Sequence, residues 1–170
     1  MKSIDIYHTE GKIDRHIIEA YAREKQVIFP ESYIELISNN NFLCPNNNLF
    51  KFKNRLDATL EYDTQDIWFM GYNLEHNYPN PALRPLLIYN SMTNDKTDPT
   101  NYGDKVIAFG NCGGGDKVCF DYRERNHDPK IVLMLHDDYE EDGQGEMKMV
   151  LIPLADSFDE FIDSLCYEDD

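Results

Sequence analysis

The 170-residue chain carries 32 acidic and 16 basic residues, a formal net charge of −16, and 41% of its residues are hydrophobic. This size and composition suit one folded domain with a sizeable core and exclude a wholly disordered chain. The negative charge repels nucleic acid and anionic membranes, and we identify neither an apolar run long enough to span a membrane nor a secretory signal. We therefore expect a cytoplasmic protein whose acidity either attracts a basic protein surface or only aids solubility.

Apolar periodicity predicts a first helix over residues 14–25. Its cap is expected to be either Thr9 or Asp14, because both side chains can accept a backbone N–H at a helix start. Four apolar residues at helical spacing are expected to face inward: Ile13, Ile17, Ala20 and Tyr21.

A second helix is expected to begin at Pro30, because proline suits the first helical turn. Tyr33, Ile34 and Ile37 lie on its predicted inward face. The asparagines at residues 39–41 are expected to end the helix, because Asn tolerates the left-handed backbone conformation found at helix C-termini.

The segment from residue 48 to residue 104 alternates polar, turn-forming stretches with short apolar runs. Three short strands are predicted from their β-forming residues, at residues 48–52, 66–72 and 85–91. Residues 57–63 are compatible with either a short helix or an irregular link, and residues 92–104 have the composition of a loop.

The run "NCGGGDKVCFDYR", residues 111–123, raises a choice between a phosphate-binding loop and a turn. A Walker-type loop needs G-x-x-x-x-G-K-[ST] leading into a helix. Here Lys117 leads into a strand pattern, and Asp116 would repel an anion. We therefore predict a hairpin between strands at residues 105–110 and 117–123, in which the glycines allow positive backbone angles.

The C-terminal third contains a strong apolar strand pattern and a helix start. The run "PKIVLMLH", residues 129–136, predicts a central strand, and residues 147–155 predict the last strand, with an acidic loop between them. Ser157 and Glu160 form a capping box for a final helix, whose apolar stripe is Phe158, Phe161, Ile162 and Leu165. The order of elements predicts a single α+β domain over residues 1–170. Its central, mostly antiparallel sheet is packed against N-terminal helices and a C-terminal helix.

Five pieces of the chain occur in an order typical of one family: "FPESYIELISNNNF", "IWFMGY", "VIAFGNCGGGDKVCFDYR", "IVLMLHDD" and "LADSFDEFIDSL". Together they resemble the SUKH superfamily, which includes bacterial toxin-immunity proteins and the fungal cell-wall synthesis regulator. The resemblance covers a core at residues 13–165, with matching positions at Pro30, Tyr33, Gly110, Gly115, Asp116, Phe120, Asp121, Ser157, Phe158 and Phe161. Asn41-Phe42 departs from the family's usual Asn-Gly, so the turn there is expected to differ. The resemblance implies an α+β fold and a protein that neutralises a partner toxin by binding it, without catalysis.

The run "HDDYEEDGQGE", residues 136–146, holds six acidic residues. Residues 136–170 contain 13 acidic residues and one basic residue, so three quarters of the net charge lies in this C-terminal part. The run is open to three interpretations: a solvated loop, a casual calcium site, or a contact surface for a basic protein. The EF-hand pattern itself fails, because Met149 stands where a bidentate Glu is required. The predicted partner-binding residues are Asp116, Asp121, Asp137, Asp138, Glu140, Glu141, Asp142 and Glu146.

Catalysis, cofactor binding and metal binding have little support in the residues. The five histidines lack i, i+4 ligand spacing, the four cysteines form no C-x-x-C pair and are expected to be reduced, and Ser157 is better explained as a helix cap than as a nucleophile. Adjacent His136 and Asp137 leave an acid–base pair, and hence a hydrolase, as an alternative. Trp68, the one tryptophan, is expected to be buried, with an exposed interface anchor as the alternative.

These observations predict a non-enzymatic immunity protein without cofactor or metal. Its partner is expected to be a cognate toxin, of nuclease type, with a basic active-site cleft that attracts an acidic surface. The alternative is a regulatory scaffold of the cell-wall-regulator type.

Overall fold

The computed structural model describes residues 3–54, 59, 61–72 and 98–168. The described residues of the first half of the chain form two helices and five short strands: β1 (Ile6–His8), α1 (Arg15–Glu24), α2 (Glu31–Asn39), β2 (Cys44–Pro45), β3 (Leu49–Lys53), β4 (Tyr62–Asp66) and β5 (Trp68–Phe69). The second half holds longer strands and the last helix: the 3-10 turn η2 (Gly103–Lys105), β6 (Val106–Asn111), β7 (Lys117–Asp121), β8 (Lys130–Glu141), β9 (Met147–Ala155) and α4 (Phe158–Ser164).

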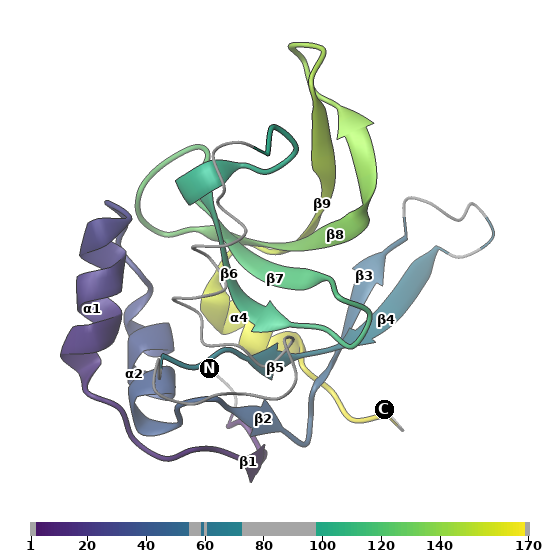
Figure 1. Cartoon of the computed structure of the whole chain (residues 1–170). Coiled ribbons are helices and arrows are strands. Elements are labelled where there is room, and N and C mark those ends of the chain that lie inside the picture. The colour runs from purple at the N-terminus through teal and green to yellow at the C-terminus, as the bar shows by residue number, and fades with distance from the viewer. Residues whose placement is uncertain (1–2, 55–58, 60, 73–97, 169–170) are drawn as a thin grey trace.

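The main sheet is antiparallel, with the strand order β5-β6-β7-β8-β9. Two smaller antiparallel pairs, β1–β2 and β3–β4, complete the β structure. Helices α1 and α2 lie at one side of the molecule, and α4 packs against β8 and β9 (Figure 1). The predicted α+β class, with a mostly antiparallel sheet, is confirmed.

An aromatic cluster joins α2 and α4 to the main sheet. The rings of Phe109 on β6 and Phe120 on β7 stack with their centroids 4.2 Å apart. Tyr33 of α2 packs edge-on against Phe120 at 5.0 Å and against Phe158 of α4 at 5.4 Å. Each such pair contributes about 0.5–1.5 kcal/mol beyond the area it buries. The two helices are therefore held against β6 and β7, and β8 and β9 follow next to β7 in the same sheet.

The helix starts follow local signals, but the inward stripe predicted for the first helix is only partly right: Tyr21 is buried and Ile13 packs partly against the core. Asp14 caps α1 by accepting the N–H of His16 at 2.9 Å. The helix begins at Arg15, after Ile13, and its buried face does not coincide with the stripe that we counted from Ile13. Its buried residues are Ile18, Tyr21 and Ala22, whereas Ile17 and Ala20 are exposed.

Helix α2 buries Tyr33, Ile34 and Ile37 as predicted, but its end differs from the prediction. The capping residue Asn40 has φ −139°, so no asparagine of the run is left-handed. The left-handed residue is Phe42, with φ +56°. Phe42 stands where the resemblance led us to expect Gly, the residue that adopts this left-handed conformation at the lowest cost.

The middle segment was only partly predicted. Strand β3 matches the expectation for residues 48–52, but Tyr62 and Asp63 belong to β4 and not to a short helix or an irregular link. The expected single strand at residues 66–72 is divided, because Asp66 ends β4 in one sheet and Trp68 begins β5 in another. The strand predicted at 85–91 lies outside the described residues.

Trp68 is half-buried, because β5 points Ile67 and Phe69 into the core and Trp68 to the other side. The expectation of full burial is therefore wrong, although the ring is not fully exposed either. All four cysteines are free thiols. Within the described residues, no helix has both the length and the apolar character needed to cross a membrane.

Candidate functional site

The expected acidic loop at residues 136–146 is largely not a loop. Strand β8 continues to Glu141, and β9 begins at Met147, so only the tip of a β-hairpin turns. Figure 1 shows this hairpin projecting beyond the other strands of the main sheet. We call residues 137–149 the acidic arm. The acidic side chains of the run therefore stand on an extended, hydrogen-bonded structure.

A bulge in β8 separates the acidic arm from the sheet. Met134 pairs with Leu151, and the next pair is Tyr139 with Met149. Four residues of β8, at 135–138, therefore oppose the single residue Val150 of β9. Such bulges bend and twist a strand, which is how the arm leaves the plane of the sheet.

His136 ties the bulge to the glycine turn between β6 and β7. Oδ1 of Asp116 accepts the backbone N–H of His136 at 3.0 Å and lies 2.9 Å from its Nδ1. Oδ2 of Asp116 accepts from Nε2 of Gln65 at 2.7 Å. The other ring nitrogen, Nε2, lies 2.9 Å from Oδ2 of Asp137. Both imidazole nitrogens are thus engaged, which favours a structural role for His136 over that of a free acid–base group.

The carboxyl group of Asp116 is buried, and its pKa lies below the ordinary aspartate value. Burial alone would raise the pKa, but hydrogen bonds from His136 and Gln65 outweigh it. Asp116 was predicted as a partner-binding residue. The structure instead places its carboxylate inside the base of the acidic arm.

Within the glycine turn, Gly115 occupies a position where the backbone angle and the close approach of His136 require a glycine. Its φ is +102°, and a Cβ there would lie 2.9 Å from Cε1 of His136. Below it, the buried ammonium of Lys117 donates to the Gly115 carbonyl at 2.5 Å and to Oδ1 of Asn111. Burial lowers the pKa of Lys117. The predicted hairpin turn is confirmed, and it supports the arm.

The tip of the acidic arm is a tight turn organised by Asp142. Its Oδ1 accepts the backbone N–H groups of Gln144 at 2.8 Å and Glu146 at 3.0 Å, and these bonds lower its pKa. Gly145 adopts φ +84° and donates its N–H to the Asp142 carbonyl. The Asp142 carboxylate thus shapes the turn, while the neighbouring acidic side chains point outward.

The segment at residues 98–102 braces β9 where the arm begins. The N–H of Met149 donates to the carbonyl of Thr100 at 2.9 Å, and the hydroxyl of Tyr102 donates to the carbonyl of Met149 at 2.7 Å. Lys148 donates to the Pro99 carbonyl at 2.5 Å. These bonds cover part of the outer edge of β9 and hold the arm in place.

The predicted site residues fall into two groups. Asp121 lies on the body of the protein, where Nε and Nη2 of Arg123 bind its carboxylate at 2.9 and 2.8 Å. The acidic arm carries the other six besides Asp116: Asp137, Asp138, Glu140, Glu141, Asp142 and Glu146. The side chain of Asp137 is 82% exposed, and Glu141 and Glu146 are exposed as well. The arm, and not one continuous patch, gathers most of the predicted charge.

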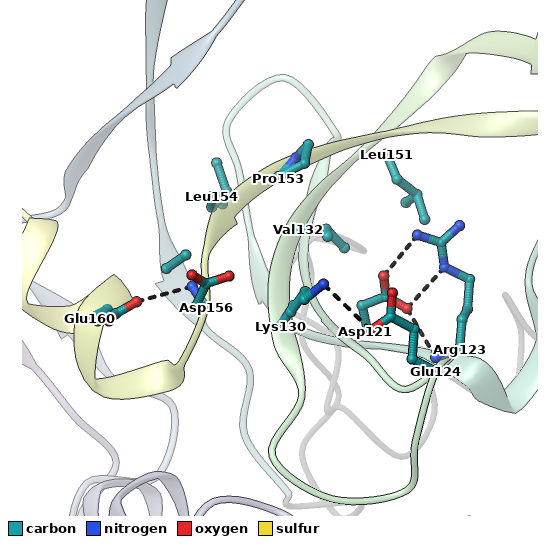
Figure 2. A pocket seen from close by; sticks show the side chains of 11 residues that line it. Asp121, Arg123, Glu124, Lys130, Val132, Leu151, Pro153, Leu154, Asp156 and Glu160 are labelled. Atoms are coloured by element: carbon teal, nitrogen blue, oxygen red, sulfur yellow. Dashed lines mark hydrogen bonds and ion pairs between the residues drawn. The ribbon is translucent and has the colours of Figure 1, made fainter.

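Asp121 borders an open groove of about 430 Å³, shown in Figure 2. Its apolar floor includes Val132, Leu151 and Pro153. Both of its cations pair with a carboxylate, Arg123 with Asp121 and Lys130 with Glu124 at 3.4 Å, and two further acidic residues, Asp156 and Glu160, also line it. Because the paired charges compensate each other, the groove offers a partner less unpaired charge than the acidic arm does.

Two arm residues were not singled out from the sequence. Tyr139 and Met147 are large hydrophobic residues with 45% and 50% of their surface exposed. Tyr139 stands alone among acidic residues, and Met147 is only the first residue of the predicted last strand, so the sequence does not show that the two share a face. Only the pairing of β8 with β9 shows that they share one side of the hairpin.

The fold and the acidic arm define an α+β domain that carries a projecting, negatively charged hairpin. The chain belongs to the SMI1 / KNR4 family (SUKH-1), whose model matches residues 12–164. This confirms the resemblance to the SUKH superfamily and is consistent with an immunity-type or a regulatory protein-interaction module. A comparison with curated proteins gives no match. In the part of the chain that the structure describes, no group of three or more His, Cys, Asp or Glu side chains could hold a metal ion.

Proposed function

We propose that this protein is a non-enzymatic immunity protein that binds and neutralises a cognate toxin domain through its acidic arm. The observation that carries the proposal is the arm itself: six carboxylates and a single lysine on a rigid hairpin that projects from the body. Family membership supports a protein partner. The proposal places the encounter in the cytoplasm, where the toxin would act.

The arm's charge favours a partner with a basic cleft, such as that of a nuclease. Lys148, the arm's one cation, lies 3.2 Å from Glu146 and donates to a backbone carbonyl, so it adds little positive charge to the surface. A concentrated negative charge on a projecting element speeds association with a cationic surface. Added salt screens this attraction and weakens it. A carboxylate-lined hairpin can occupy a cleft built to hold phosphates.

The test compares two variants with the same change in net charge. In the arm variant Asp138 and Glu141 become lysine; in the control Glu24 of α1 and Glu35 of α2, both exposed, become lysine. The probe is the catalytically inactivated toxin domain encoded beside this gene. Asp142 is left unchanged because its carboxylate shapes the tip of the arm.

We expect the arm variant to bind at least about tenfold more weakly than the control and to lose most of the salt dependence of binding. It should also fail to rescue growth of cells that make the active toxin. Equal binding by the arm variant and the control, or affinity that ignores salt, contradicts the proposal.

A regulatory scaffold of the cell-wall-regulator type is the second candidate, because the matching family carries the description SMI1 / KNR4. The gene neighbourhood separates the two candidates. An adjacent gene whose product ends in a toxin domain favours immunity. Several partners bound with no toxin among them favour the scaffold.

A further inference from the structure

One face of the acidic arm is apolar at its centre. Tyr139 lies opposite Met149, and Glu141 lies opposite Met147, in the register of β8 and β9. Since side chains alternate along a strand and cross-strand partners share a side, all four project from the same face. On that face Tyr139 and Met147 are about half exposed, and Met149 packs partly against the core.

This apolar face is held in place before any partner arrives. The hydroxyl of Tyr139 donates to the His136 carbonyl at 3.2 Å, which fixes the ring against the bulge. The Thr100 carbonyl accepts the N–H of Met149 and the Tyr102 hydroxyl donates to the Met149 carbonyl, which fixes the backbone of Met149, and the Asp142 turn fixes the tip. A surface that is already ordered loses little conformational entropy on binding.

The surroundings of the face indicate what kind of surface fits it. Glu141 is exposed on this same face, whereas Glu140 and Glu146 lie on the opposite face of the hairpin with Lys148. Apolar or aromatic residues at the centre with charges at the edge are the usual anatomy of a protein–protein contact. The negative edge disfavours an anionic membrane and requires a partner with positive groups next to an apolar recess.

We infer that Tyr139 and Met147 are the apolar anchors of the partner interface, and that the partner presents an apolar recess bordered by Lys or Arg side chains. The inference rests on the proposed function and adds a division of labour to it. The carboxylates bring the partner to the arm, and the two anchors keep it there. Charged groups at an edge mainly set the association rate, whereas buried anchors mainly set the dissociation rate.

The experiment measures association and dissociation rates with the inactivated toxin domain encoded beside the gene. Replacing Tyr139 and Met147 together by alanine should raise the dissociation rate about 10- to 100-fold and change the association rate by less than about threefold. Replacing Asp138 and Glu141 by lysine should mainly lower the association rate and should change the dissociation rate little. Peroxide should oxidise Met147 more slowly in the wild-type complex than in the free protein.

Three further variants keep the result interpretable. Tyr139→Phe retains the ring and should bind about as tightly as wild type. Met147→Gln retains the length of the side chain but not its apolar character, and should weaken binding roughly tenfold. Tyr62→Ala removes an aromatic residue that is 59% exposed on β4, away from the arm, and should have no effect.

The failures of the two proposals look different. If the wild-type protein neither binds the toxin domain nor rescues growth, the proposed function is wrong and this inference falls with it. If binding is tight and charge-dependent but the Tyr139 and Met147 variants dissociate no faster than Tyr62→Ala, the inference alone is wrong. A folded far-UV spectrum for each variant confirms that the arm residues, and not misfolding, set the rates.

Discussion

Replacing Gly115 by alanine should destabilise the protein by about 1–4 kcal/mol. At φ +102° a side chain is strained, which costs about 1–3 kcal/mol. The added Cβ would also lie 2.9 Å from Cε1 and 3.0 Å from Nε2 of His136. The Gly115 backbone cannot easily yield, because Lys117 holds its carbonyl from below. The imidazole must therefore move away from Asp116, and losing this partly exposed contact between Nδ1 of His136 and Oδ1 of Asp116 adds at most about 1 kcal/mol.

Gly114→Ala is the matched control, because a Cβ at Gly114 meets nothing within 4 Å. Urea unfolding followed through the fluorescence of Trp68 gives the free energy of unfolding for each variant. We expect Gly114→Ala to lie within about 0.5 kcal/mol of wild type. Each kcal/mol lost at Gly115 should lower the melting temperature by about 2–4 °C.

A double variant separates the two causes. Adding His136→Ala removes the ring that the new methyl group meets, so the double variant should lose less than the sum of the single variants. What remains is the cost of the backbone conformation. If Gly115→Ala is as stable as Gly114→Ala, the account of how the glycine turn supports the acidic arm is wrong.

Two other predictions concern stability. Ser157→Ala removes the cap that accepts the N–H of Glu160 at 3.2 Å and should lower the free energy of unfolding by about 1 kcal/mol, whereas Ser157→Asp should retain it; urea unfolding measures both. Asp116 has a lower pKa in the folded protein than in the unfolded chain, so its contribution to stability is complete well above pH 4 and is lost as the pH falls below that value. Asp116→Asn should therefore flatten the acid side of the curve of unfolding free energy against pH, and a variant curve as steep as that of wild type would contradict this.

Local chemistry explains which parts of the fold were predictable. The caps at Asp14 and Ser157 and the glycine turn each depend on a few neighbouring residues, and the structure contains all three. The reciprocal bond of the predicted capping box was only approximate, because Glu160 accepts the N–H of Asp156 and not that of Ser157. Short-range sequence patterns thus predict where these helices and the turn occur, but they do not always predict which backbone N–H a capping side chain accepts.

The acidic arm could not be predicted in this way, because Asp and Glu are poor strand formers. A run with six of them has the composition of a solvated loop. What makes it a hairpin is pairing with the adjacent strand β9 and the bonds from β9 to residues 98–102, a segment distant from the arm in the sequence. The bulge at residues 135–138 is likewise invisible without the register. The sequence therefore shows the concentration of acidic residues but does not predict the paired hairpin that carries them.

The arm's pairing limits the repulsion between its charges and leaves the charges themselves in place. Like charges directly opposite each other destabilise a β-hairpin. In the arm, Glu140 lies opposite Lys148 and Glu141 lies opposite Met147, so neither of these glutamates faces another carboxylate across the strands. Asp142 is neutralised in part by the backbone N–H groups of the tip. A hairpin of neutral residues would need none of these arrangements, so the carboxylates cost the fold some stability, as the proposed role in attracting a cationic partner leads us to expect.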